Sequence, residues 1–469
     1  MQREPLQIEG VREGAHIHFI GIGGVHMRAH AEQLHNSGYV VTGSDQNESE
    51  ATAHLRARGI GVCIGHAAEH VAADTSLVVY TAAVQADNPE LVAAQAQGIR
   101  TMERAVLLGQ MMRNYRHPVC FSGTHGKTTA TSMAAEIFLA AAADPTIAVG
   151  GILPSIGGTV RDGGRDVFVV ESCEYCDAFL HFFPYIGVIL NIEFDHADYF
   201  ADLDAVYASF RAFADLIPAE GTLIVNAGVE RLASLIEGLD CRVLIVDGAN
   251  AALRAEDIRY DARGCAAFTV VCKRQNGDEV WGEVSLNTPG RHNVSNALAA
   301  MMAAQVLHMP FEAMVQGLAN FGGSGRRAEI KGTMATGAIV MDDYAHHPTE
   351  VRAAWAAVRG GSYGKIFCVF QPHTRTRTLS LLDDFSTSFG DADVVVLLDI
   401  YEPAGREEHG VDISSAVLAK RLEAQGVNVY YAKDRSEAVL YIQKNSLRND
   451  LCITMGAGDV SQLGKRLLS

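Results

Sequence analysis

The sequence predicts an α/β protein of three domains, and three observations support this prediction. Its 469 residues are too many for one hydrophobic core, since a domain usually takes roughly 100–200 residues. Short apolar runs alternate with helical patterns, which is typical of parallel sheets. Two glycine-rich loops each stand between an apolar run and a helical pattern, as nucleotide-binding loops do.

The composition is that of an ordinary globular chain, with 48% hydrophobic and 20% charged residues. No apolar run approaches the roughly 20 residues of a membrane span, so we expect no membrane insertion. A net charge of −17 argues against a nucleic-acid partner, because that binding depends on clustered Lys and Arg. The opening residues MQREPLQIEG lack the apolar core of an export signal, so we expect a cytoplasmic protein.

The nine cysteines are odd in number and scattered from Cys63 to Cys452, which favours reduced core residues over a disulfide framework. Only Cys173 and Cys176 form a C-x-x-C pair, and a zinc site of this kind usually needs a second pair. The sequence therefore gives only weak support to zinc or redox chemistry at this pair.

The first unit reads as an apolar strand, a glycine turn, a helix and a second strand. These are HIHFIGIGG at 16–24, VHMRAHAEQLHNSG at 25–38 and YVVTGSD at 39–45. Further strands are expected at VCIG, 62–65, and SLVVYTAA, 76–83, with helical segments between them. This alternation predicts a parallel sheet.

The second unit opens at HPVCFSGTHGKT, where a buried strand precedes the loop and the helix-forming run TTATSMAAEIFLAAAA follows it. Buried strands are expected at DVFVVES, 166–172, and at YIGVILNIE, 185–193. The glycine cluster FGGSG at 321–325 is a plausible linker that ends this unit.

The third unit again alternates strands with helical patterns; its expected strands are AIVMDDY, KIFCVFQ, DVVVLLDIY, VNVYYA and LCITMGAG. Polar side chains follow four of these strands. In chain order they are Asp343, Tyr344, His346, His373, Arg377, Tyr401, Arg406 and Asp459. Because ligands of open α/β sheets bind beyond the carboxyl ends of the strands, we expect one polar rim that faces a cleft.

The first glycine loop, GIGGVHM, is similar to the dinucleotide pattern G-x-G-x-x-G, and Asp45 ends the next strand about 20 residues on, where a ribose-binding acid belongs. Taken alone, this suggests NAD. However, His26 replaces the third glycine. The amides of Gly21, Gly23 and Gly24 could still hold another nucleotide diphosphate at a helix N-terminus, or form a turn without a ligand.

The second loop, FSGTHGKTTATS, has Phe121 where the pattern G-x-x-x-x-G-K-[ST] places its first glycine. Its position between a strand and a helix is nevertheless right for a phosphate loop. Lys127 would reach terminal phosphates and the hydroxyl of Thr128 could ligate magnesium. Glu171 ends the next apolar strand, where NTPases often keep a carboxylate for the metal; the alternative is a solvated strand-end acid.

Another strand ends in NIEFDHADYF, which would place Asn191, Asp195 and His196 beside this loop. Histidine is not a preferred ligand of magnesium, so the residues alone leave open whether His196 is a ligand or a hydrogen bonder. These patterns predict an ATP-dependent enzyme, without its reaction.

GTHGKTT resembles the phosphate loop of the Mur ligases, a shortened form in which Gly123 is the first glycine. Motifs spread over nearly the full chain extend the resemblance: HFIGIGG, GSD, NIEFDH, GRHNVSNALAA, GRRAE, DDYAHHPTEVRAA, FQPHTRTRT, DIYEPAGRE and GAGD. Their order and spacing together are highly specific to this family.

The resemblance implies three domains: an N-terminal Rossmann-like domain for a UDP-sugar over 1–112, a central P-loop ATPase-type parallel sheet over 113–323, and a C-terminal Rossmann-like domain over 324–469. DDYAHHPTE and FQPH resemble the members that join L-alanine to the lactyl carboxylate of UDP-N-acetylmuramate through an acyl phosphate. The resemblance therefore implies ATP and Mg²⁺, a role in cytoplasmic peptidoglycan precursor synthesis, small-molecule partners, and a monomer or homodimer.

By matching position, the resemblance also implies roles for particular residues. ATP would contact Gly123, Thr124, His125, Gly126, Lys127, Thr128, Thr129, Asn191, His292, Asn293, Asn296, Arg327 and Asp343. Lys127, Glu171 and His196 would be catalytic, and the metal would be held by Thr128, Glu171 and His196. The UDP-sugar would contact Gly21, Gly23, Gly24, Ser44 and Asp45, and the amino acid would contact Tyr344, His346, His373 and Arg377.

Some positions depart from the common family pattern. His26, Arg28 and His30 replace small or neutral residues, and they either contact the sugar nucleotide or line a helix surface. Thr374 stands where an arginine often contacts substrate, which puts the identity of the amino acid in some doubt. Three alternatives stay open: a ligase that adds a recycled peptide to the same sugar nucleotide, a non-catalytic nucleotide-binding paralogue, and an NAD-dependent dehydrogenase.

Overall fold

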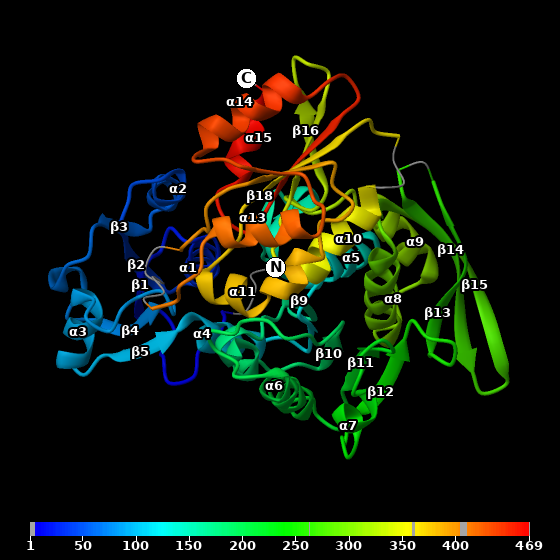
Figure 1. The fold of residues 1–469 in the computed structure, drawn as a ribbon. Helices are drawn as coiled ribbons and strands as arrows, with labels where there is room; N and C mark the ends of the chain where they lie inside the picture. The colour runs from blue at the N-terminus through cyan, green and yellow to red at the C-terminus, as the bar shows by residue number, and fades with distance from the viewer. Residues whose placement is uncertain (1–4, 262, 359–361, 404–409, 469) are drawn as a thin grey trace.

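Three β-sheets with surrounding helices make up the protein in the computed structural model, which describes residues 5–261, 263–358, 362–403 and 410–468 (Figure 1). The sheets follow one another in the chain and fall within the three predicted domains, which confirms the three-domain α/β prediction. The exact boundaries between the domains stay a prediction.

The N-terminal sheet is entirely parallel, with the strand order β3-β2-β1-β4-β5. Its elements are β1 (His16–Ile20), α1 (Val25–Asn36), β2 (Val40–Asp45), α2 (Glu50–Ala57), β3 (Gly61–Ile64), η1 (Ala68–His70), β4 (Thr75–Tyr80), α3 (Pro89–Ala96), β5 (Arg100–Glu103) and α4 (Arg104–Met112). The order reverses between β1 and β4, and the first glycine loop follows β1 at this switch point. That is where open α/β sheets bind ligands.

The central sheet has ten strands in the order β15-β14-β13-β12-β11-β10-β6-β9-β7-β8. Its elements are β6 (His117–Ser122), α5 (Lys127–Ala140), β7 (Thr146–Leu153), η2 (Pro154–Ile156), β8 (Gly158–Arg161), β9 (Val167–Glu171), η3 (Tyr175–His181), β10 (Ile186–Ile189), α6 (Leu203–Asp215), β11 (Thr222–Asn226), α7 (Leu232–Ile236), β12 (Arg242–Val246), β13 (Leu253–Tyr260), β14 (Cys265–Arg274), β15 (Gly277–Pro289), α8 (Arg291–Val306) and α9 (Phe311–Asn320). In Figure 1 the strands β13, β14 and β15 extend to the right of the molecule.

The predicted parallel sheet is confirmed for the middle of this sheet but not for its edges. β13, β14 and β15 are joined as antiparallel strands, and β8 runs antiparallel to β7. The connection from β14 to β15 is too short for a parallel crossover, which needs a dozen or more residues. The dipeptide Asn276-Gly277 at this connection is a hairpin signal that our sequence analysis did not use.

The C-terminal sheet has the order β16-β17-β21-β18-β19-β20 and is parallel apart from β16. Its elements are β16 (Glu329–Thr333), β17 (Ile339–Asp343), α10 (Pro348–Val358), β18 (Ile366–Phe370), α11 (Arg375–Ser380), α12 (Leu382–Ser386), β19 (Val394–Leu397), α13 (Ser415–Ala424), β20 (Val429–Tyr431), α14 (Arg435–Asn445), β21 (Leu451–Met455) and α15 (Ser461–Leu468). Because β17, β18, β19 and β21 are parallel, the polar residues that follow them share one edge, as expected. Arg406, expected on this rim, lies outside the described residues.

Helix α5 is almost fully buried because it packs against the central sheet and against both α8 and α9. Its run of small residues permits this close approach. A Cβ added to Gly317 of α9 would lie only 2.5 Å from the Cα of Ile137 in α5. The helix that follows the phosphate loop is therefore held firmly against the sheet.

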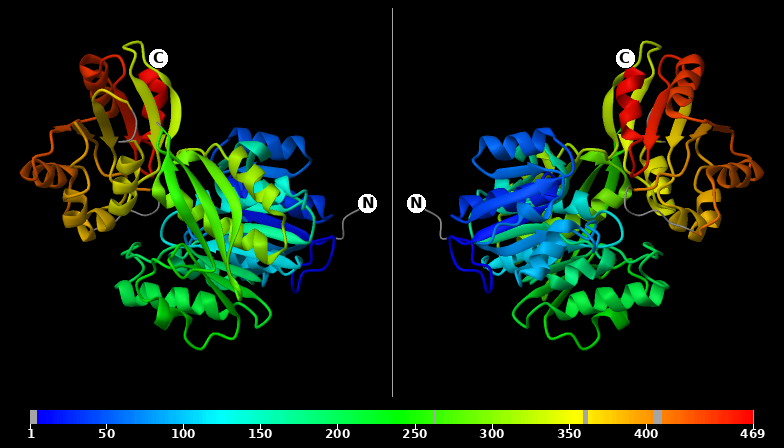
Figure 2. Two further views of the ribbon diagram at one scale, coloured as in Figure 1. Left: turned by 90° about the vertical axis from the view of Figure 1, so that its right-hand side faces the viewer. Right: turned by 90° about the vertical axis from the view of Figure 1, so that its left-hand side faces the viewer.

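The C-terminal unit stands above the central sheet, while the N-terminal unit lies to one side of it (Figures 1 and 2). Among the described residues, no helix is long and apolar enough to cross a membrane. All nine cysteines are free thiols, but Cys63 and Cys176 are exposed and Cys173 is half-buried. The expectation that every cysteine belongs to the core was therefore wrong for these three. Cys63 lies in the edge strand β3, Cys173 lies between β9 and η3, and Cys176 lies in η3.

Candidate active site

The second glycine loop joins the buried strand β6 to α5, in the strand-loop-helix arrangement that the sequence predicted. Gly123 and Gly126 have φ angles of +142° and +81°, which favour glycine. Gly126 is also the N-cap of α5, and a Cβ there would lie 2.8 Å from Oδ1 of Asn296. Only glycine allows both the turn and the close approach of α8.

Asn191 fixes the shape of this loop, although it lies far along the chain. The amide N–H of His125 donates to Oδ1 of Asn191 at 2.7 Å, and Nδ2 of Asn191 donates to the carbonyl of His125 at 2.9 Å. The two residues meet because β6 and β10 are neighbouring parallel strands that end at the same edge. The structure thus places Asn191 beside the loop, as the sequence predicted.

Lys127 is the first residue of α5, and its ammonium group folds back onto the loop. Nζ donates to the carbonyls of Gly123 and Thr124 at 2.6 and 3.0 Å and to both carboxylate oxygens of Glu174 at 3.1 and 2.9 Å. Burial acts to lower the pKa of Lys127, but the carboxylate of Glu174 outweighs it and raises the pKa above its ordinary value. The lysine is therefore a fixed positive charge at the mouth of the loop.

Thr128 and Glu171 form an oxygen-rich pair beside this charge. The Thr128 hydroxyl donates to Oε1 of Glu171 at 3.0 Å, and the amide of Gly150 donates to Oε2 at 2.6 Å. A hydroxyl and a carboxylate are oxygen donors of the type that Mg²⁺ prefers. The pair fits the magnesium role expected for it.

His196 lies in the loop after β10 with φ +54°, a conformation that a residue with a side chain rarely adopts. Its Nε2 is 3.8 Å from the Glu174 carboxylate and 3.9 Å from that of Asp195. Burial lowers its pKa, although Asp195 and Glu174 act in the opposite direction. A neutral imidazole can accept a hydrogen bond or bind a metal.

A cavity of about 310 Å³ opens beside the phosphate loop, between the central and C-terminal units. Most of the predicted ATP contacts line it: His125, Gly126, Thr129, Asn191, His292, Asn293, Asn296, Arg327 and Asp343. The other four, Gly123, Thr124, Lys127 and Thr128, lie in the adjoining loop and first turn of α5. Residues spread over more than two hundred positions of the sequence thus surround one cavity.

Asp343 and Arg327 bring the C-terminal unit to this cavity. The carboxylate of Asp343 accepts hydrogen bonds from the amides of Ala328 and Ala345, both at 2.8 Å. Burial raises its pKa. The guanidinium of Arg327 stacks 5.0 Å above the Tyr344 ring. Both residues therefore form part of the cavity wall on the side of the C-terminal unit.

The four predicted amino-acid contacts form one cluster on the C-terminal rim. The rings of Tyr344 and His346 are 5.1 Å apart, and those of His346 and His373 are 5.9 Å apart. Nη1 of Arg377 lies 3.0 Å from Nδ1 of His373. Arg377 also forms a two-bond ion pair with Asp195 of the central unit, which our sequence analysis did not predict.

In the first glycine loop, the amide of Gly23 donates to Oδ2 of Asp45 at 2.9 Å. The amide of Gly21 donates to the carbonyl of Ser44, whose hydroxyl is fully buried and donates to Glu90 at 2.6 Å. The predicted residues Gly21, Gly23, Gly24, Ser44 and Asp45 therefore lie together. The Ser44 hydroxyl points into the protein interior and hydrogen-bonds Glu90, so only the backbone of Ser44 contacts the glycine loop.

The positions that depart from the family pattern have different surroundings. His26 is largely buried beside Arg104, and burial together with that cation lowers its pKa to about 4. His30 is fully buried, with Nδ1 3.4 Å from Oε1 of Gln33. Thr374 caps α11, where its hydroxyl accepts a hydrogen bond from the amide N–H of Arg377 at 3.4 Å. Thr374 thus supports the helix that carries Arg377.

Sequence reasoning missed several acidic residues that contact the predicted ones: Glu174, Glu193, Glu350 and, as the partner of Arg377, Asp195. Glu193, Asp195 and Glu350 lie inside quoted motifs, so those motifs were a signal. Glu174 lies outside them, three residues after the predicted Glu171. The partners of Glu350 and Asp195 were not predictable, because these contacts cross between the central and C-terminal units. Glu174 and Glu193 contact predicted residues of their own unit.

His125 makes one contact of each kind. Its Nδ1 is 3.2 Å from Glu350 and its Nε2 is 3.5 Å from Glu193. Burial acts to lower the pKa of His125, but these two carboxylates raise it to about 9.

Comparison with known proteins agrees with this geometry. Three family models match in order: "Mur ligase family, catalytic domain" over residues 16–116, "Mur ligase middle domain" over 121–304, and "Mur ligase, glutamate ligase domain" over 326–458. A "UDP-N-acetylmuramate--L-alanine ligase" of Clostridium novyi is 46% identical over 452 residues, which cover 96% of this chain and 97% of the relative. That of Acetivibrio thermocellus is 44% identical and covers 99% and 98%.

Solved structures show the same architecture. The UDP-N-acetylmuramate-alanine ligase MurC of Thermotoga maritima matches with a TM-score of 0.78 and 28% identity, over 96% of this chain and 97% of that one. A murein peptide ligase of Psychrobacter arcticus shares the fold, with a TM-score of 0.71 and 24% identity over 97% and 98% of the two chains.

The structure combines a phosphate loop with a cavity between the central and C-terminal units, and the N-terminal parallel sheet adds a third unit. This combination defines a class of three-domain nucleotide-binding enzymes. The chain belongs to the Mur ligase family, since the family models span most of it and relatives above 40% identity cover nearly all of it. This confirms the resemblance drawn from GTHGKTT and the other motifs.

Proposed function

We propose that this protein joins L-alanine to the lactyl carboxylate of UDP-N-acetylmuramate and cleaves ATP to ADP and phosphate. The observation that carries the proposal is the cavity beside the phosphate loop, whose walls come from both the central and the C-terminal units. The names of the relatives over nearly the full chain supply the identity of the two substrates to be joined.

ATP would place its adenosine part in the cavity of about 310 Å³ and its triphosphate along the loop toward Lys127. Loop amides and the N-terminus of α5 supply partial positive charge to the phosphates. Arg327 and Asp343 would complete the cavity from the other side, so nucleotide binding should favour the closed arrangement of the two units. This explains why the predicted ATP contacts come from two domains.

Mg²⁺ fits the oxygen donors Thr128 and Glu171, with His196 nearby, and when bound it would neutralise charge on the terminal phosphates. Lys127 lies on the same side of the loop and carries a permanent positive charge. Both charges oppose the repulsion that arises when a carboxylate approaches a triphosphate.

The chemistry follows from the poor reactivity of a carboxylate toward amines. An oxygen of the lactyl carboxylate attacks the γ-phosphorus, the bond to the β–γ bridging oxygen breaks, and ADP leaves. The resulting acyl phosphate has a good leaving group. The neutral amine of L-alanine then attacks the acyl carbon, phosphate departs, and the surplus amine proton passes to solvent.

The sugar nucleotide would bind at the first glycine loop, where Gly21, Gly23 and Gly24 present amides at the N-terminus of α1. L-alanine would bind at Tyr344, His346, His373 and Arg377, with its carboxylate on the guanidinium of Arg377. We further propose domain boundaries at 112/113 and 323/324, a cytoplasmic enzyme, and a monomer or homodimer.

Phosphate release tests this proposal. Purified protein with ATP, Mg²⁺ and UDP-N-acetylmuramate should release phosphate when L-alanine is added. Glycine and L-serine should support slower release, and a peptide that begins with L-alanine should support none. Release that depends on the peptide but not on L-alanine would contradict the proposal, as would release that does not require the sugar nucleotide.

A further inference from the structure

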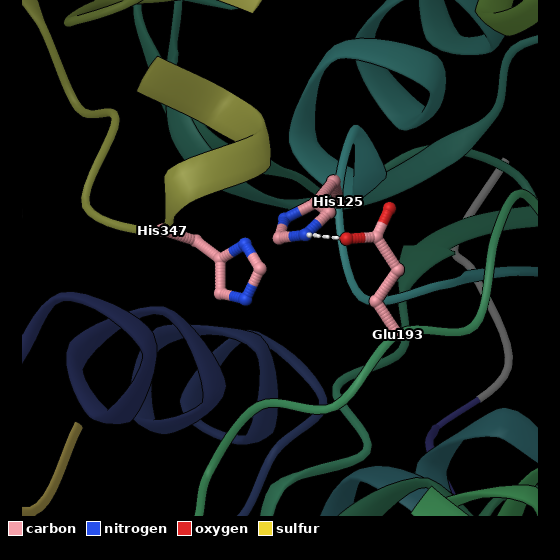
Figure 3. A group of neighbouring side chains, drawn as sticks. All are labelled: His125, Glu193 and His347. Atoms are coloured by element: carbon pink, nitrogen blue, oxygen red, sulfur yellow. Dashed lines mark ion pairs between the residues drawn. The ribbon is translucent and has the colours of Figure 1, made fainter. Parts of the chain in front are cut away.

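Two histidines and one glutamate form a compact cluster at the edge of the phosphate loop: His125, Glu193 and His347 (Figure 3). One nitrogen of each histidine and one carboxylate oxygen of the glutamate all lie within 4.8 Å of one another. The proposed ligase chemistry uses neither Glu193 nor His347.

The three residues come from three separate segments. His125 lies in the loop between β6 and α5, Glu193 follows β10, and His347 directly precedes α10 of the C-terminal unit. The cluster therefore spans the boundary between the central and C-terminal units. A ligand bound by all three side chains would connect the phosphate loop to the C-terminal unit.

The surroundings of His125 orient its ring toward the cluster. Nδ1 lies 3.2 Å from Oε1 of Glu350, which accepts a hydrogen bond from it. Nε2 lies 3.5 Å from Oε2 of Glu193 and would release its proton when a metal ion binds. This Nε2 atom is buried and makes no well-aligned hydrogen bond within the described part of the chain. A carboxylate on the outer nitrogen of a histidine is a common arrangement behind metal ligands.

His347 is oriented in the same way by a backbone carbonyl. Its Nε2 donates a hydrogen bond to the carbonyl oxygen of Phe194 at 3.2 Å, because that oxygen can only accept. Nδ1 therefore carries the lone pair, and its contact with the amide of Thr349 is long, at 3.3 Å. The Thr349 hydroxyl donates to Oε2 of Glu193 at 2.5 Å and holds that carboxylate in place. All three side chains thus have partners behind them.

We propose that His125, Glu193 and His347 bind one divalent cation of the zinc class, which ties the C-terminal unit to the phosphate loop. Two imidazoles and one carboxylate, with a fourth position left for water, are a recurrent zinc ligand set. Tetrahedral ligands at about 2.1 Å from zinc lie about 3.4 Å from one another. The His125–Glu193 separation already matches this value, and the remaining pairs need to close by little more than 1 Å.

This site differs from the proposed magnesium position in both place and chemistry. Thr128 and Glu171 offer oxygen atoms to a hard cation, whereas the cluster offers two nitrogen atoms, which favour zinc over magnesium. Millimolar Mg²⁺ should therefore leave the zinc site available. Because its ligands come from both units, the bound cation would oppose their separation.

Metal binding to the full-length protein tests the proposal without any substrate. Metal-free protein in excess Mg²⁺ is titrated with ZnCl₂ against a chromophoric chelator, and separately with CoCl₂ to record the visible absorption of tetrahedral cobalt. His347→Ala and Glu193→Gln should each weaken zinc binding at this site by at least about tenfold and abolish the cobalt band. His54→Ala, which changes an exposed histidine on α2, should retain both.

Circular dichroism shows whether each variant is folded, and Glu193→Gln carries the test if His347→Ala does not fold. Zinc affinity unchanged in either folded variant would overturn the proposal, and so would wild-type protein that gives only the weak spectrum of octahedral cobalt. The outcome is independent of ligase activity, because neither ATP nor the sugar nucleotide is present in the titration.

Discussion

Arg377 of α11 and Asp195 of the segment after β10 form a buried ion pair between the C-terminal and central units. Nε donates to Oδ1 at 2.8 Å and Nη2 donates to Oδ2 at 3.2 Å, while both side chains are more than nine-tenths buried. The pair fixes the plane of the guanidinium. Its two terminal nitrogens each retain a second N–H that can be offered to a substrate carboxylate.

Removing one member of this pair should destabilise the protein more than removing both. Asp195→Ala leaves the buried Arg377 cation without its carboxylate partner, at a cost of about 3–5 kcal/mol. The double variant with Arg377→Ala should recover part of that loss, which chemical denaturation would measure. Arg352→Ala, which breaks an exposed pair with Asp384, is the control and should cost less than about 1 kcal/mol. Strictly additive losses would contradict this prediction.

Lys127→Ala should give a folded protein that has lost turnover. The lysine bonds the carbonyls of the loop and the carboxylate of Glu174, and its charge is needed when the lactyl carboxylate meets the γ-phosphate. We expect phosphate release to fall by about 10²–10³-fold or more, with an unchanged circular dichroism spectrum. Lys465→Ala, at an exposed position of α15, should retain full activity. A loss below tenfold in Lys127→Ala would mean that the loop does not hold the triphosphate.

Thr128→Val should raise the Mg²⁺ concentration needed for half-maximal activity by about tenfold, because the substitution keeps the shape but removes an oxygen ligand. The control is Thr131→Val one turn further along α5, where the hydroxyl donates only to the carbonyl of Lys127. An equal magnesium requirement in both variants would argue against Thr128 as a metal ligand.

Glu90 should contribute acid sensitivity to the N-terminal unit. Burial acts to raise its pKa, but hydrogen bonds with His18, Ser44 and His70 lower it from 4.5 to about 2. A lowered folded-state pKa stabilises the fold above pH 4.5, and that contribution is lost as pH falls toward 2. Glu90→Gln should therefore reduce stability at neutral pH and flatten its decline over that range in denaturant titrations. Glu69→Gln, at an exposed position, should keep the wild-type slope.

Gly109→Ala should weaken the packing of α4 on η3. A Cβ at this position would lie only 1.9 Å from the backbone carbonyl oxygen of His181, so the helix has to move. We expect a loss of about 1–3 kcal/mol, measured as a lower denaturation midpoint. Gly158→Ala, where nothing lies within 4 Å of the added carbon, should be close to neutral.

The alternation of apolar runs with helical patterns was sufficient to predict the parallel strands next to the two glycine loops and the C-terminal polar rim. Their apolar runs are short, buried on both faces and bounded by glycine or polar residues, as in DVFVVES and KIFCVFQ. The antiparallel strands β13, β14 and β15 were not predicted. β13 and β15 are more exposed and carry many charged residues, so their apolar pattern is weak. β14 is largely buried and apolar, and its run CAAFTVVC was a strand signal that went unused.

For the site, the loop residues were predictable because glycine, lysine and threonine must occur at fixed spacing next to a strand. The contacts between units were not. Nothing in the spacing of Asp195 and Arg377 or of His125 and Glu350 indicates that they meet, since those distances depend on how separate domains pack. Ser44 was predictable by position, but the sequence did not reveal that its hydroxyl points inward to Glu90.

The hydrogen bonds between His125 and Asn191 also have a consequence for synthesis of the protein on the ribosome. The two residues are 66 positions apart, so the GTHGKTT stretch is made well before the partner that shapes it. A nascent chain that ends before β10 would carry the complete motif without the hydrogen bonds that fix the backbone of His125. We therefore expect the loop of a truncated chain to take its final shape only once Asn191 has left the ribosomal tunnel and paired with His125.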